Sequence, residues 1–117
     1  MNLKASDFSA SDNGEFIDFG FYDKDLTYGF GFSRIHGDKR IGMMVADQSI
    51  YDLTEAEIRF TPYEFSIELQ KGTIKPIDGD DVYHISYGTL SSDIYQRSLA
   101  LLKNLLKDKS SVLLRCT

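Results

Sequence analysis

Residues 15–35 read EFIDFGFYDKDLTYGFGFSRI, two aromatic runs joined by a short acidic turn. Large residues alternate with small or polar ones in both runs, 15–22 and 27–35, and this alternation indicates β-strands. Phenylalanine and tyrosine are also enriched in strands. The large residues that share one face of each run are Ile17, Phe19 and Phe21, and then Tyr28, Phe30 and Phe32. Because the link is too short for a crossover helix, we expect the two strands to pair antiparallel.

The rest of the chain extends this pattern on both sides. Asn13-Gly14 precedes the first run and is a strong hairpin signal. The ranges expected to be strands are 2–10, 15–22, 27–35, 40–47, 55–60, 63–69, 82–87 and 112–115. Ser91 or Ser92 can cap a single helix, whose apolar stripe is expected to be Ile94, Ser98, Leu101, Leu102 and Leu105. The sequence therefore predicts one α+β domain over 1–117, an antiparallel β-sheet meander or half-barrel with one C-terminal helix packed on it.

Glycines occupy the strand face opposite the large apolar residues. They are Gly20, Gly29, Gly31 and Gly42. Glycine inside a strand often marks a bulge or the close approach of another backbone. Two interpretations follow: the C-terminal helix lies over this shallow face, or the face stays open as a binding groove.

Composition excludes several classes of function. The chain has 13 basic and 18 acidic residues and a net charge of -5, whereas proteins that follow a phosphate backbone need a cationic face. No run reaches the ~18–20 apolar residues of a membrane helix, and the N-terminus lacks the apolar core of a secretory signal. The single cysteine, Cys116, excludes an internal disulfide and a multi-cysteine zinc site. We expect a cytoplasmic protein that binds neither nucleic acid nor membranes.

Residues with catalytic potential are few. His36 lies in a predicted turn and His84 in a predicted strand, and their spacing matches no common metal motif. Asp78-Gly79-Asp80-Asp81 lacks the ligand spacing of a calcium loop. We therefore expect no enzyme activity, no metal and no cofactor.

Charge is distributed unevenly along the chain. Residues 1–93 carry 17 acids and 8 bases, a net charge of -9, whereas residues 94–117 carry 1 acid and 5 bases, a net charge of +4. Aromatic residues lie among the acids, a combination that fits an interface for a basic protein. The residues expected to bind such a partner are Phe16, Asp18, Tyr22, Asp23, Asp25, Asp47, Tyr51, Asp52, Glu55 and Glu57. The alternative is that these acids belong to ordinary solvated loops.

The N-terminal region resembles a known class of proteins. Leu3-Lys4-Ala5-Ser6-Asp7-Phe8-Ser9-Ala10, an acidic turn, and then Phe16-Ile17-Asp18-Phe19-Gly20-Phe21 are similar to the opening of small bacterial immunity proteins. Those proteins belong to toxin systems that include contact-dependent growth inhibition. The similarity covers roughly the first 20–35 residues, together with size and acidity. It implies a cytoplasmic inhibitor that binds one toxin domain, often a basic nuclease, and blocks or distorts its active site.

Two other functions fit the same features. One is an acidic chaperone or adaptor for a secreted effector, and such proteins commonly dimerise, whereas the immunity interpretation favours a monomer. The other is a small ligand-binding or enzymatic domain that uses the glycine-lined face.

Overall fold

Ten strands and one helix make up the described part of the chain. The computed structural model describes residues 2–23, 29–46, 49–69 and 82–116. The elements are β1 (Asn2–Lys4), β2 (Asp7–Asp12), β3 (Phe16–Tyr22), β4 (Gly29–Ile35), β5 (Gly42–Ala46), β6 (Ser49–Asp52), β7 (Ala56–Phe60), β8 (Glu64–Leu69), β9 (Val82–Ser86), α1 (Ser92–Leu105) and β10 (Val112–Arg115). The α+β class with one C-terminal helix packed on strands is confirmed.

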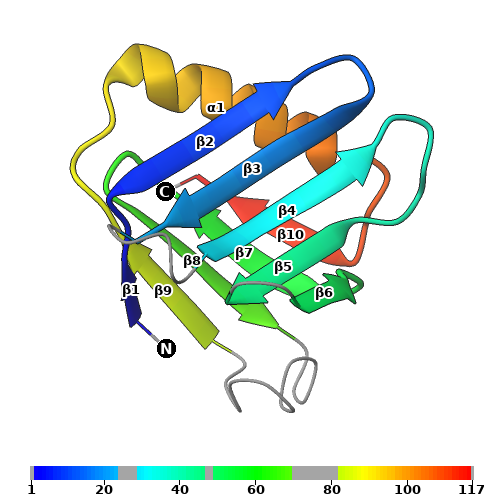
Figure 1. The fold of residues 1–117 in the computed structure, drawn as a ribbon, viewed down its shortest axis with the longest axis horizontal. Helices are drawn as coiled ribbons and strands as arrows, with labels where there is room; N and C mark the ends of the chain where they lie inside the picture. Colours follow the sequence, from blue (N-terminus) through cyan, green and yellow to red (C-terminus); the bar gives the residue numbers. More distant parts are fainter. Residues whose placement is uncertain (1, 24–28, 47–48, 70–81, 117) are drawn as a thin grey trace.

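The strands form two sheets that face each other (Figure 1). The first is the antiparallel meander β2-β3-β4-β5-β6, which contains both aromatic runs. The second has the order β1-β9-β8-β7-β10, and its two outer strands pair parallel to their neighbours. The expected meander is therefore present, and a second, mixed sheet lies behind it.

The expected first strand, 2–10, is divided between the two sheets. The Ala5 N–H donates to the carbonyl of Ser86 at 2.8 Å, in the second sheet, whereas the next N–H, of Ser6, donates to the carbonyl of Tyr22 at 2.9 Å, in the meander. The chain thus passes from one sheet to the other within two residues. The hairpin that follows turns at Gly14, whose φ of 89° is a left-handed conformation that favours glycine.

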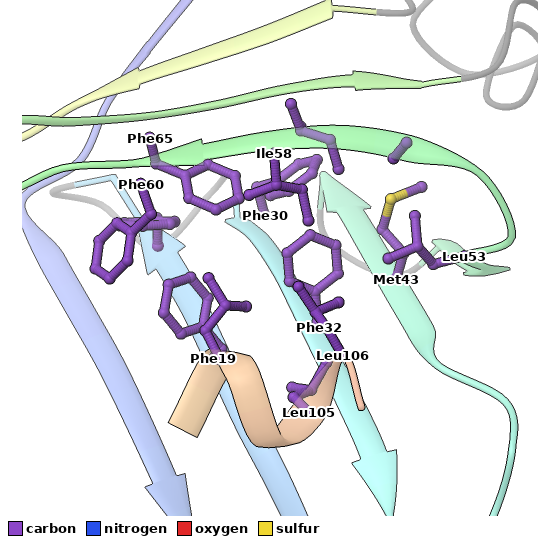
Figure 2. Close-up of a cluster of buried hydrophobic side chains, with 14 of the residues drawn as sticks. Phe19, Phe30, Phe32, Met43, Leu53, Ile58, Phe60, Phe65, Leu105 and Leu106 are labelled. Carbon is purple, nitrogen blue, oxygen red and sulfur yellow. The ribbon is translucent and has the colours of Figure 1, made fainter. Parts of the chain in front are cut away.

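Aromatic side chains fill the space between the sheets (Figure 2). Phe19 and Phe32 of the meander face Phe60 and Phe65 of the second sheet, with Leu105 and Leu106 beside them. All six are buried. The core therefore lies on the phenylalanine face of β3 and β4.

Helix α1 contributes its buried side chains to the same core. Ser91 caps it, accepting a hydrogen bond from the N–H of Ile94 at 3.2 Å. Its buried residues are Tyr95, Ser98, Leu99, Leu102 and Leu105, whereas Ile94, expected on the buried stripe, is 43% exposed. The helix packs on the phenylalanine face of the meander, so the interpretation that it covers the glycine face is wrong (Figures 1 and 2).

Arg34 connects the meander to the C-terminal end of α1. Its guanidinium donates to the main-chain carbonyls of Asp38 at 2.8 Å and of Leu105 at 2.9 Å, and also to that of Lys107. The last carbonyls of a helix lack partners within the helix, and a cation there also complements the helix dipole. Arg34 therefore has a structural role, because its guanidinium joins the meander to the end of α1.

Two tyrosine hydroxyls, one part-buried and one buried, join the second sheet to its surroundings. Tyr87 donates to the carbonyl of Thr61 at 2.7 Å and stacks on Phe21, with ring centroids 5.3 Å apart. Tyr95 donates to the carbonyl of Phe60 at 2.7 Å. Burial raises the pKa of both phenols, and the pKa of Tyr87 is raised further by Tyr95 and Glu64.

This arrangement predicts a loss of stability in alkaline solution. Above pH ~10 an exposed tyrosine in the unfolded chain releases its proton, whereas folded Tyr87 keeps it, so unfolding becomes more favourable as the pH rises. We expect Tyr87→Phe to reduce the loss measured by urea unfolding between pH 8 and pH 11. The difference should be at most about 1 kcal/mol per pH unit, because the ring is partly exposed. Equal losses in the two proteins would contradict this assignment.

Candidate functional site on the outer face of the meander

The face of the meander that points away from the core carries the acids and glycines of the aromatic runs. We define this outer face by the described residues Asp7, Ser9, Ser11, Phe16, Asp18, Gly20, Tyr22, Gly31, Ser33, Ile35, Gly42, Met44 and Asp52. Strand alternation places them opposite buried Phe19, Phe21, Phe30 and Phe32. Helix α1 and the second sheet both lie on the other side (Figure 1). Within residues 2–23, 29–46, 49–69 and 82–116, no helix or second sheet covers the outer face.

The strand register arranges the residues of this face in rows across the strands. One row runs Ser9, Gly20, Gly31, Met44 across β2 to β5, and the next runs Ser11, Asp18, Ser33, Gly42, Asp52 across β2 to β6. Asp18 and Asp52 stand three strand spacings apart, about 14 Å. Between them the surface consists of one serine and one glycine.

A hollow of about 260 Å³ lies over these two rows. Glycines 20, 31 and 42 line its floor, and Asp18, Tyr22 and Met44 are among the side chains around it. A second hollow, of about 470 Å³, continues from Ser33 and Gly42 toward Ile35, Arg40 and Asp52. Of the two interpretations of the glycine face, the structure therefore agrees with the groove, which is shallow, and not with a face covered by the helix.

The acidic side chains near this surface differ in whether a basic side chain lies beside them. Asp38 borders the second hollow, and the pKa of its carboxyl is lowered, first by the Arg40 N–H at 2.9 Å and then by the Arg40 guanidinium at 3.4 Å. Asp12, at the end of β2, lies 2.8 Å from the His36 ring, and this hydrogen bond is the main cause of its lowered pKa. Within the described residues, no ion pair reaches Asp18 or Asp52. Together with Asp7 on β2, these two carboxylates give the outer face its negative charge.

The structure gathers part of the predicted partner-binding set on this face. Phe16, Asp18, Tyr22 and Asp52 lie on it, and Asp23 follows directly after β3. Phe16 pairs with Ile35, which is 61% exposed, so the face also has an apolar end.

Other members of that set lie elsewhere. Glu57 is on the outward side of β7 in the second sheet, where it pairs with Arg115 at 3.2 Å, and it is no part of the Asp18 surface. Glu55 is exposed just before β7. Tyr51 pairs with Met43 rather than joining the Gly42 row, and its side chain is outside the described residues. Asp25 and Asp47 are outside them as well.

Sequence reasoning did not identify Ser33, Ile35 and Met44 as site residues. Each lines a hollow because strand pairing places it beside a predicted site residue or a glycine. The alternation of 27–35 placed Ser33 opposite Phe30 and Phe32, so this residue could have been found from the pattern alone.

The described residues form no metal-binding cluster and no membrane-spanning helix. Over 2–23, 29–46, 49–69 and 82–116, no group of three or more histidine, cysteine, aspartate or glutamate side chains could hold a metal ion. Among the helical residues described, no segment is long and apolar enough to cross a membrane. Comparison with protein-family models, curated proteins and solved structures gave no match to the chain.

Proposed function

We propose that the protein is an immunity protein, one copy of which binds and neutralises one cognate basic toxin domain, of nuclease type, in the cytoplasm. The outer face of the meander is the proposed binding surface. The observation that carries the proposal is the gathering of Asp18 and Asp52, without ion-pair partners among the described residues, with Phe16, Tyr22 and Ile35 on one open sheet face. The resemblance of the N-terminal region to immunity proteins supports the same function.

Physical chemistry favours a basic protein as the partner. Unbalanced carboxylates on an open surface attract a cationic protein and speed its approach, and complementary charges then fix its orientation. Aromatic and aliphatic side chains such as Phe16, Tyr22 and Ile35 lose water on contact and supply most of the binding energy in interfaces of this kind. A nuclease-type toxin fits because it must itself be basic to bind a phosphate backbone.

Protection of growing cells tests this function. We expect a toxin domain to be encoded next to this chain, and bacteria that produce that domain to grow only when the chain is produced as well. The purified chain should form a complex with that domain and abolish its activity in vitro. A toxin that stays active with the chain in molar excess would contradict the proposal.

A further inference from the structure

The floor of the smaller hollow is bare backbone because its glycines have little room for side chains. Gly20 and Gly31 are cross-strand partners. A Cβ on Gly31 would stand 2.8 Å from the carbonyl oxygen of Phe19, closer than such atoms approach. A Cβ on Gly20 would stand 3.2 Å from the Tyr22 hydroxyl and 3.5 Å from its Cε2. The outer end of the tyrosine ring therefore lies over Gly20, at the side of the hollow.

The walls combine one carboxylate with aromatic and aliphatic surface. Asp18 is half-buried and has no ion-pair partner among the described residues. Tyr22 and Met44 line the same hollow, and Ser9 and Ser33 add hydroxyl groups. A half-buried carboxylate and a tyrosine ring that line the same hollow favour a cation able to stack as well as pair.

The size of the hollow limits what it can hold. Its volume of about 260 Å³ lies below the roughly 300–1,000 Å³ of sites for drug-sized ligands. The space suits one long side chain. The larger neighbouring hollow is itself lined by a cation, Arg40, which pairs with Asp38 at 3.4 Å.

We infer that the hollow receives a single arginine side chain of the partner protein, an inference that rests on the proposed function. The guanidinium pairs with the Asp18 carboxylate and lies against the Tyr22 ring, and its methylene stem contacts Met44. Arginine fits better than lysine because its planar group can bond both carboxylate oxygens, stacks on aromatic rings and is more weakly hydrated.

A titration with a blocked amino acid tests this inference without the partner. The probe is N-acetyl-arginine amide, and the uncharged, nearly isosteric N-acetyl-citrulline amide is its control. We expect saturable NMR shifts of the backbone amides of Gly20, Gly31 and Gly42 with the arginine probe. Citrulline should bind about five- to tenfold more weakly, because it lacks the charge that pairs with Asp18.

Two variants complete the design. Asp18→Asn should weaken arginine binding about five- to tenfold, whereas Glu68→Gln, which removes a charge from an exposed position of the second sheet, should leave it unchanged. Equal affinities for arginine and citrulline, or arginine binding that survives Asp18→Asn, would overturn the inference. So would the lack of saturable shifts at the glycines.

Failure here is distinguishable from failure of the proposed function. If the arginine probe does not bind but the toxin domain still contacts the outer face, only the arginine pocket is wrong. If the toxin domain contacts another surface, the proposed binding face is wrong whatever the probe does.

Discussion

Replacing Phe65 by alanine is expected to lower the free energy of unfolding by about 3–5 kcal/mol. Phe65 is fully buried in β8 and lies between the two sheets (Figure 2). Its ring centroid is 5.1–6.1 Å from those of Phe19, Phe21, Phe30 and Phe32, all from the meander. Truncation removes the aromatic surface that holds the sheets together and leaves a cavity. Since small domains are stable by only about 5–15 kcal/mol, this is a large fraction of the total.

Urea unfolding at neutral pH measures this effect. The matched control is Tyr63→Ala, which removes an aromatic ring of similar size that is 64% exposed just before the same strand. We expect the control to change stability by no more than about 0.5 kcal/mol. A loss below about 1 kcal/mol for Phe65→Ala would mean that the aromatic layer does not hold the sheets together.

The second large effect is expected on association with the proposed toxin partner. The double variant Asp18→Lys with Asp52→Lys replaces two carboxylates of the outer face, neither of which has an ion-pair partner among the described residues, with cations. Like charges then face each other across the interface. We expect association to slow about ten- to a hundredfold at low salt, and its dependence on ionic strength to flatten.

A control with the same change of net charge isolates the position of the charges. Glu57→Lys with Glu68→Lys lies on the outward side of the second sheet, away from the proposed surface. Stopped-flow association at two ionic strengths should show a much smaller effect for this pair. Equal slowing by both pairs would mean that only the net charge of the chain matters, and would contradict an interface on the outer face of the meander.

Local patterns were sufficient for most of the secondary structure. Asn13-Gly14 indicated the first hairpin, the alternation of large residues indicated β3 and β4, and Ser91 or Ser92 indicated the start of α1, which Ser91 caps. Each depends on residues close together in the chain. The division into two sheets depends instead on distant partners, such as the parallel pairing of β1 with β9 and of β10 with β7. Short local patterns carry no information about these pairings.

The same difference between local patterns and distant strand pairings explains which predicted site residues lie together on the outer face. The outward positions Asp18 and Tyr22 followed from the alternation of one strand. Glu57 was grouped with Asp52 because the two are close in sequence, but the chain passes from the meander to the second sheet between them, and Glu57 forms its own pair with Arg115. Met44 joins the hollow only through its pairing with Gly31.

An NMR cross-saturation experiment on the complex with the proposed toxin partner tests the central claim most directly. It reports which residues of the chain lie against the partner. We predict the strongest saturation transfer at Asp18, Tyr22, Ser33 and Asp52, on the outer face of the meander. Transfer concentrated instead on α1, or on the outward side of the second sheet around Glu57 and Glu68, would contradict the proposed surface.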